Sequence, residues 1–370
     1  MKNAVKKIFA CIAFLSIFFA IAFKIGIYFK PTDNAEARST IANFYNEEKN
    51  SIDVVAIGAS SIYRYWNAPY IYDNYEVTSY CLGTPIQLAE AAPYLMKEAS
   101  KTQDVKLFVV EVRRLFRDQI MAIDEENRLG EKGLYYFSVV TDSMQYSLNR
   151  TLLIDEVIEE KGDKLIWNID LLKYHDNWKK ISNESIEQTE EIYNSASELK
   201  SALPAKAGKL IADGQYPDYE LISGYELDEK HKKLIDDIQN TAKKLGARVM
   251  FVYTPHYSND KYYSISQSMK KYCYVKGYDY LDANSLTAFE QMNLSFAGDF
   301  YNKYHVNING SEKFSDYVMQ YIMERYGLVK TPLTGVAAMS WQRACIKYFE
   351  ISVQYKEDIE QRRRELGALF

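Results

Sequence analysis

IDVVAIGASS, residues 52–61, joins a short apolar run to a glycine and a pair of serines. The run at residues 52–57 is almost wholly apolar, which is typical of a strand buried on both faces of a parallel sheet. Gly58 allows a sharp turn, and Ser60 or Ser61 would then begin a helix, where backbone N–H groups favour negative charge. The stretch predicts a strand that delivers a nucleophilic serine to a sheet edge, or a serine that only caps the helix.

Two further apolar runs indicate more buried strands, VKLFVVEV at residues 105–112 and ARVMFVY at residues 247–253. Helical stretches lie between and after these runs, at residues 85–101, 227–245 and 311–326. In the last of them, apolar residues recur at the spacing of one helix face. Strands that alternate with helices predict an α/β fold with a mainly parallel sheet.

The chain is expected to have three parts. Residues 1–30 would form a signal anchor or transmembrane helix, and residues 31–330 the α/β domain. Within that domain, residues from about 130 to 224 are polar and contain no convincing apolar strand, so we expect a helical insertion there. Residues 331–370 would carry a C-terminal amphipathic helix, at about 339–366.

The N-terminal part contains the apolar run IFACIAFLSIFFAIAFKIGIYF at residues 8–29, interrupted only by one serine and one lysine. About 20 apolar residues suffice for a helix to cross a bilayer. Lys2, Lys6 and Lys7 precede the run and favour a cytoplasmic N-terminus, which would leave the main domain outside the cell membrane. A cleaved signal peptide is the alternative, because Ala-Ile-Ala at residues 20–22 suits signal peptidase.

Composition argues against several classes of function. The 370 residues are 47% hydrophobic and 26% charged, as in a folded globular chain. A net charge of -5 argues against a general nucleic-acid binder, which needs an electropositive surface. We expect no cofactor and no metal, because the sequence has no Walker A loop, no G-x-G-x-x-G turn and no cluster of histidines and cysteines.

A second informative stretch, DFYNKYHVNINGSEKF at residues 299–314, places His305 on a polar loop just before a helix. A histidine can take the proton of a serine when a partner holds its other ring nitrogen. Asn302 and Asp299 precede His305 in this loop and are the two candidate partners. A lone loop histidine is often only structural, but here another part of the chain offers a serine nucleophile.

These motifs resemble the SGNH, or GDSL, hydrolase superfamily. The resemblance rests on Gly-Ala-Ser at residues 58–60, Leu-Gly-Thr at residues 82–84 after a second short segment, and the stretch at 299–314. It covers about residues 51–327 and is strongest for a membrane-anchored bacterial branch linked to acylation of cell-envelope polymers, including the D-alanyl transfer protein of lipoteichoic acid. The piece YHDNW at residues 174–178 also looks like that branch.

The resemblance implies an SGNH-like three-layer fold, with Ser60 as nucleophile, His305 as base and Gly83 as a backbone donor to the oxyanion. The YHDNW piece adds His175 as a candidate substrate-binding residue. The chain departs from the superfamily in two places. Asn302 stands where an aspartate is usual, and two arginines stand where the oxyanion asparagine would fall.

The missing aspartate leads us to expect that Asp299 supplies the charge behind His305. A carboxylate stabilises an imidazolium better than an amide does, and the loop is long enough to turn back. In the rival arrangement, Asn302 occupies the usual acid position and the enzyme is intrinsically slow.

Other candidate residues follow the remaining strands. Arg113 and Arg114, after the run at 105–112, can donate to an oxyanion or bind a substrate phosphate. Alternatively, they pair with acidic neighbours such as Glu111 and Asp118. His256 follows the run at 247–253 and is expected to line the same cleft, or to be a loop histidine bonded to backbone.

The favoured function is therefore extracytoplasmic, serine-dependent acyl transfer or ester hydrolysis on a cell-envelope polymer, with an acetyl or D-alanyl group. The alternative is a non-catalytic SGNH-like partner protein that binds envelope glycan or assists a membrane O-acyltransferase. Both readings make the chain a single-pass protein of the cell membrane. The expected partners are an envelope polymer or glycan and a membrane O-acyltransferase, not nucleic acid.

Overall fold

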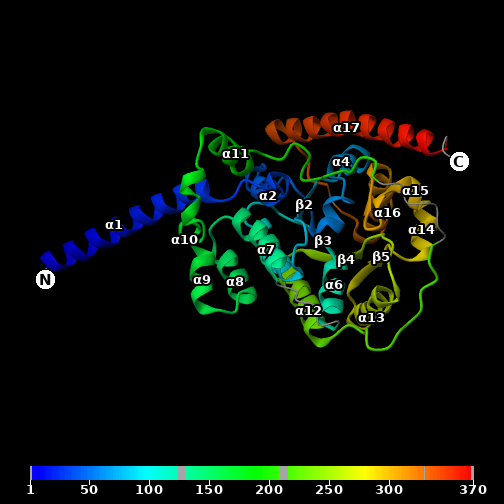
Figure 1. The fold of residues 1–370 in the computed structure, drawn as a ribbon, viewed down its shortest axis with the longest axis horizontal. Coiled ribbons are helices and arrows are strands. Elements are labelled where there is room, and N and C mark those ends of the chain that lie inside the picture. The colour runs from blue at the N-terminus through cyan, green and yellow to red at the C-terminus, as the bar shows by residue number, and fades with distance from the viewer. Residues whose placement is uncertain (1, 124–129, 209–215, 329, 368–370) are drawn as a thin grey trace.

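The computed structural model describes residues 2–123, 130–208, 216–328 and 330–367. Its centre is a five-stranded parallel sheet with the strand order β2-β1-β3-β4-β5 (Figure 1). The strands are β1 (Val54–Gly58), β2 (Ser79–Gly83), β3 (Leu107–Glu111), β4 (Arg248–Tyr253) and β5 (Asp279–Asp282). The three apolar runs form β1, β3 and β4, so the predicted α/β fold with a parallel sheet is confirmed.

Helices cover both faces of this sheet. Val55 of β1 belongs to one core cluster, and its neighbour Val54 belongs to the other, because side chains alternate along a strand. The first face is covered by α5 (Ala92–Ala99), α12 (Glu229–Lys244) and α13 (Asp260–Lys276), and the second by α4 (Ala68–Tyr75), α14 (Leu286–Met292) and α16 (Ile308–Tyr326). The result is a three-layer arrangement with two hydrophobic cores.

The region expected as a helical insertion is helical only in its first part. Its helices are α7 (Glu131–Ser143), α8 (Leu148–Val157), α9 (Lys161–Asn168), α10 (Asp170–Lys173) and α11 (Asn183–Asn194), with a short 3-10 helix at His175–Lys180. Residues 195–208 and 216–228 are irregular, and residues 209–215 lie outside the described residues. Phe137 and Leu153 belong to the core cluster of the first face, so the insertion helps to cover the sheet.

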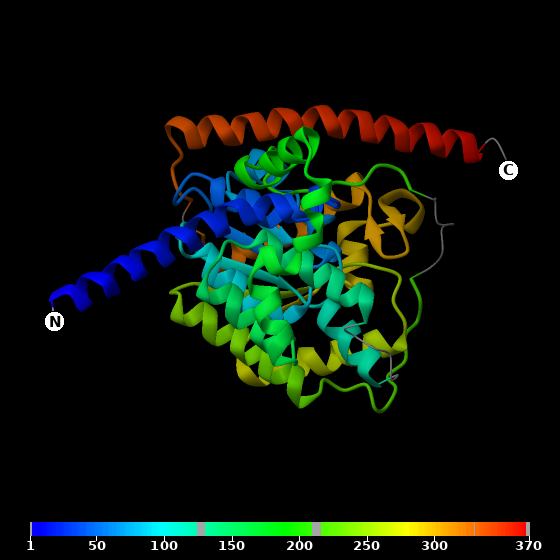
Figure 2. The same ribbon diagram turned by 60° about the vertical axis from the view of Figure 1, so that its left-hand side comes forward.

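The N-terminal helix α1 (Lys2–Gly26) projects away from the rest of the molecule in both views (Figures 1 and 2). The segment Val5–Phe29 is long and apolar enough to cross a membrane. Most of its side chains are uncovered, and Phe9, Phe14 and Ile17 are more than half exposed. Near its end, Phe23 packs against Tyr146. This helix is compatible with the expected membrane anchor.

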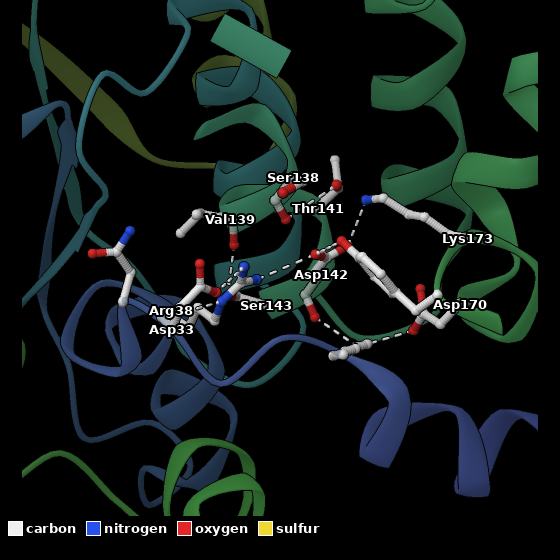
Figure 3. Close-up of polar contacts among 12 residues, drawn as sticks. Asp33, Arg38, Ser138, Val139, Thr141, Asp142, Ser143, Asp170 and Lys173 are labelled. Atoms are coloured by element: carbon white, nitrogen blue, oxygen red, sulfur yellow. Dashed lines mark hydrogen bonds and ion pairs between the residues drawn. The ribbon is translucent and has the colours of Figure 1, made fainter. Parts of the chain in front are cut away.

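A network of buried charges lies just after α1 (Figure 3). Arg38, on α2 (Ala35–Ala42), and Lys173 both bind the carboxylate of Asp142, at 3.2 and 2.8 Å. Lys30 and Arg150 both bind Asp170, at 3.1 and 2.9 Å. The network therefore ties the segment that follows α1 to three helices of the insertion.

The C-terminal helix α17 (Gly335–Gly367) lies along the outside of the second core. It begins slightly earlier than the predicted 339–366, and its last residues, 368–370, lie outside the described residues. Trp341, Tyr348 and Ile359 are buried against the domain, which confirms the amphipathic pattern. Met339 and Phe349 lie on the opposite, exposed side.

Candidate active site

Ser60 stands at the turn between β1 and the short helix α3 (Ser60–Tyr63). Gly58 ends the strand, and a Cβ atom at this position would lie 2.8 Å from the Cβ of Glu111. Such a contact is closer than real Cβ atoms tolerate, so the close approach of Glu111 requires glycine at residue 58. The local sequence Gly-Ala-Ser thus brings Ser60 to the carboxyl edge of the sheet, where α/β proteins place their ligands.

The two adjacent serines have different partners. The Ser60 hydroxyl lies 2.8 Å from Nε2 of His305, although the two residues are 245 positions apart in sequence. The Ser61 hydroxyl instead donates to the carboxylate of Glu111, and Ser61 is only 1% exposed. The geometry therefore selects Ser60, rather than Ser61, as the candidate nucleophile.

His305 is held in a small antiparallel hairpin formed by β6 (Phe300–Asn302) and β7 (His305–Val306). Asn302 and His305 are paired across this hairpin, and Oδ1 of Asn302 lies 3.1 Å from Nδ1 of His305. The same oxygen accepts the backbone N–H of Tyr304 at 2.8 Å. An amide oxygen only accepts, so Nδ1 of His305 carries the hydrogen and Nε2 is left to accept from Ser60.

The expectation that Asp299 orients His305 is wrong for this arrangement. Asp299 ends the short helix α15 (Phe296–Asp299) and is 3% exposed. Its carboxylate accepts from Lys313 of α16 and from the backbone N–H of Ser295, both at 2.8 Å. The hairpin register places Asn302 opposite the imidazole ring of His305. Asp299 precedes the first strand of the hairpin, and its carboxylate contacts α16.

Glu111, the last residue of β3, was expected only as an alternative partner for the two arginines, yet it lies behind the nucleophile turn. Besides Ser61, its carboxylate accepts from the Thr254 hydroxyl and from the backbone N–H of Arg113, both at 3.0 Å. Burial raises its pKa, against the opposing effect of the nearby Arg113 guanidinium. The sequence signal was present, since a glutamate inside an apolar strand needs internal partners.

The two arginines that open α6 (Arg113–Ile123) have separate roles. A side-chain N–H of Arg113 donates to the carbonyl of Tyr304 at 2.7 Å, directly before His305 in the chain. Arg114 pairs with Asp118 one helical turn away, at 2.7 Å. The side chain of Arg114 thus pairs with an acidic neighbour, as the alternative expectation had it. The side chain of Arg113 instead contacts the hairpin that holds the candidate base.

A cavity of about 650 Å³ opens beside the Ser60–His305 pair. His256 lines this cavity and is buried. Its Nδ1 atom lies 3.2 Å from the carbonyl oxygen of Thr254. His256 therefore both lines the cleft and contacts the backbone, so the two alternatives expected from the sequence are both observed.

Ile86 also lines the cavity and has a φ of 54°, a left-handed conformation that is costly for a β-branched residue. Such strain often accompanies functional loops, but no sequence signal pointed to Ile86.

Two candidate residues do not line this cavity. Gly83 is buried at the end of β2, next to Gly58 of β1 in the sheet. His175 is in the insertion, and its side chain is 71% exposed. Its ring contacts the carbonyl of Leu172 at 2.9 Å and the carboxylate of Asp176 at 3.5 Å. The structure thus does not bring His175 to the Ser60–His305 pair.

The electrostatics of the site keep His305 neutral. Burial is the main cause, and the guanidinium groups of Arg113 and Arg64 act in the same direction, so the pKa of His305 falls to about 3. Burial and Arg113 also hold the pKa of His256 well below its usual value. A neutral imidazole can accept the Ser60 proton, but the imidazolium that results has no carboxylate in hydrogen-bond contact among the described residues.

Within the described ranges, no group of three or more histidine, cysteine, aspartate or glutamate side chains could hold a metal ion. Comparison with models of known protein families finds no match for this chain, and a search of curated proteins finds no similar sequence.

Proposed function

We propose that this protein is a serine-dependent acyltransferase or esterase. The single observation that carries the proposal is the 2.8 Å contact between the Ser60 hydroxyl and Nε2 of His305, with Nδ1 held by Asn302. A histidine with one nitrogen fixed and the other on a serine hydroxyl is the arrangement that activates a serine nucleophile. The adjacent cavity offers room for an ester.

The reaction would proceed in two steps. Ser60 Oγ bonds to the acyl carbon of an ester while its proton passes to Nε2 of His305. The bond from the acyl carbon to the leaving oxygen then breaks, and His305 returns the proton to that oxygen. In the second step, an acceptor hydroxyl or water gives its proton to His305 and attacks the acyl carbon, which releases Ser60 with its proton restored.

We also propose a superfamily and a cellular location for this protein. Gly-Ala-Ser after β1, Gly83 at the end of β2 and the histidine near the last helix of the domain support membership of the SGNH superfamily. Helix α1 supports single-pass anchoring, and the preceding lysines support an extracytoplasmic domain. The proposed substrate is then a cell-envelope polymer or glycan that receives or loses an acetyl or D-alanyl group, with a membrane O-acyltransferase as partner.

A second candidate function is a non-catalytic partner protein that binds envelope glycan. The observation that favours it is the amide of Asn302 behind His305. An amide fixes the ring but does not stabilise the imidazolium as a carboxylate does. In a serine protease, replacing the triad aspartate by asparagine lowers turnover about 10⁴-fold.

Labelling with a fluorophosphonate probe separates the two functions. The full chain in detergent should be labelled at Ser60, and Ser60→Ala should abolish the labelling. Ser61→Ala is the matched control and should keep it, because the Ser61 hydroxyl is bonded to Glu111. If the parent chain takes no label and cleaves no ester such as p-nitrophenyl acetate, the non-catalytic function replaces the enzymatic one.

A further inference from the structure

The cavity beside Ser60 is lined by cations. Arg113, Arg114, Arg117 and Lys303 all contribute to its wall, and no aspartate or glutamate does so among the described residues. The whole chain, by contrast, carries a net charge of -5. Positive charge is therefore concentrated at the candidate site, against the sign of the protein as a whole.

The cations of this wall differ in their partners. Arg114 is paired with Asp118. Arg113 donates to the neutral Tyr304 carbonyl, and the nearby buried carboxylate of Glu111 compensates part of its charge. Arg117 and Lys303 are exposed, and no salt bridge to either side chain is found in the described part of the chain. The charges of Arg117 and Lys303, and the remaining part of the Arg113 charge, are thus available to a ligand in the cavity.

Their placement brings these charges together near the base. Arg113 and Arg117 are one turn apart on α6, so they share a helix face, and α6 starts at the carboxyl edge of the sheet. Lys303 lies in the tight turn of the hairpin that carries His305. The first turn of a helix also favours an anion.

We propose that Arg113, Arg117 and Lys303 form an anion subsite, which binds a phosphate or carboxylate group of the acyl acceptor beside His305. The bound anion supplies the negative charge that Asn302 lacks, and so stabilises the imidazolium formed during acyl transfer. This inference rests on the proposed function, because it assigns the acceptor class of the same site.

The anion acts in the deacylation step. The acceptor hydroxyl gives its proton to Nε2 of His305 as its oxygen bonds to the acyl carbon, the bond from that carbon to Ser60 Oγ breaks, and His305 returns the proton to Ser60. Arg113 destabilises the charged ring in the empty site, and an anion paired with Arg113 reverses that effect. Anionic acceptors should therefore react faster than neutral ones.

Three matched acceptors test the subsite: glycerol, glycerol 1-phosphate and glycerate. The full chain in detergent transfers acetyl from p-nitrophenyl acetate, at constant ionic strength set with sodium chloride. One or both anionic acceptors should be acetylated at least about tenfold faster than glycerol, the change expected for about one pKa unit at His305. Whichever is faster identifies phosphate or carboxylate as the group bound.

Variants then locate the effect. In Arg117→Gln combined with Lys303→Gln, the preference for anionic acceptors should fall to about twofold or less, because both exposed charges are removed. The matched control is Lys244→Gln combined with Lys271→Gln, two exposed lysines outside the cavity, and it should keep the preference. In Asn302→Asp the preference should shrink, because the chain then carries the charge itself.

If the chain cleaves the ester but acetylates the three acceptors at equal rates, the anion subsite is wrong. The proposed function is then unaffected. Equal loss of preference in the control and cavity variants also overturns the subsite. If the chain cleaves no ester at all, the proposed function fails, and calorimetry of inorganic phosphate with Ser60→Ala decides the subsite. Binding that disappears in the Arg117→Gln and Lys303→Gln variant supports an anion site, and no binding overturns it.

Discussion

Two charged regions of this molecule are built in opposite ways. In the network that follows α1, Asp142 and Asp170 are fully buried and bind cations at 2.8–3.2 Å (Figure 3). At the carboxyl edge of the sheet, Ser60, His305 and Asn302 form a chain of contacts without a carboxylate, and the nearby cations face a cavity. The first region uses charge to hold parts of the protein together, and the second leaves charge available to a ligand.

Removing the candidate base should have the largest effect on the second region. His305→Ala should lower ester cleavage by about 10³-fold or more, because among the described residues only His305 forms a side-chain hydrogen bond with the Ser60 hydroxyl. Thermal melting should show a folded protein, since the ring is partly exposed and bonds only side chains. Equal activity in His305→Ala and the parent would remove the enzymatic reading of this region.

Removing one carboxylate should damage the first region almost as much, but in stability. Asp142→Asn leaves Arg38 and Lys173 buried without their carboxylate, and the free energy of unfolding should fall by about 3–5 kcal/mol. Urea unfolding measures this loss. Asp33→Asn is the control, because Asp33 binds the same Arg38 but its side chain is 55% exposed, and it should cost at most about 1 kcal/mol.

The network should also make stability depend on acid. Burial opposes ionisation of Asp142, but Lys173, Arg38 and Lys30 outweigh it and lower its pKa to about 2 from 3.8. The carboxylate therefore stabilises the fold above about pH 4, and this contribution is lost as the pH falls from about 4 to 2. Melting temperatures of the parent and Asp142→Asn should converge over that range. Parallel curves would show that Asp142 does not carry the effect.

Placing a carboxylate in the second region should make the two regions more alike. Asn302→Asp should raise cleavage of a neutral ester by about tenfold, because the charged ring gains a direct partner. It should also change the pH profile. His305 has its pKa lowered to about 3, so the parent rate should be flat from pH 8 to pH 5. In the variant the pKa rises, and the rate should fall as the pH drops through the new value. A flat profile and an unchanged rate in Asn302→Asp would contradict this electrostatic account.

The smallest effect is expected at Asp299, whose carboxylate holds α15 to α16. Asp299→Asn should lower the free energy of unfolding by about 1–2 kcal/mol, because it weakens the contacts with Lys313 and the Ser295 N–H. Ester cleavage per folded molecule should change less than about threefold, since that carboxylate does not contact the ring. A loss of cleavage by orders of magnitude with unchanged stability would restore Asp299 as the partner of His305.

Prediction from sequence succeeded where the signal was local. The runs that became β1, β3 and β4 are apolar because both faces of the central strands are buried. Strand β5 was missed because its sequence, DYLD, lies at the sheet edge and buries only one of its residues fully. Ser60 and His305 were identified as candidates from short motifs. Ser60 follows a glycine at the end of an apolar run, and His305 lies on a polar loop just before a helix.

Prediction failed where side-chain partners depend on hairpin register, on the placement of the insertion or on contacts between strand ends. Asp299 seemed the better partner for His305 on charge, but hairpin pairing places Asn302 opposite the ring. His175 belonged to a suggestive motif, yet it projects from the insertion and does not line the cavity. Glu111 became the buried support of the nucleophile turn only because Ser61 and Thr254 approach it from other strand ends.

The sequence by itself determined the alternation of buried strands and amphipathic helices and the apolar N-terminal helix, because each depends on residues close together in the chain. Only the tertiary structure decided that Ser60 meets His305 across 245 positions, and that the amide of Asn302 rather than the carboxylate of Asp299 stands behind the ring. The Ser60–His305 contact depends on strand order and helix packing, which no short stretch of sequence encodes. The choice of Asn302 over Asp299 depends on the register of the hairpin, which an argument from charge does not reveal.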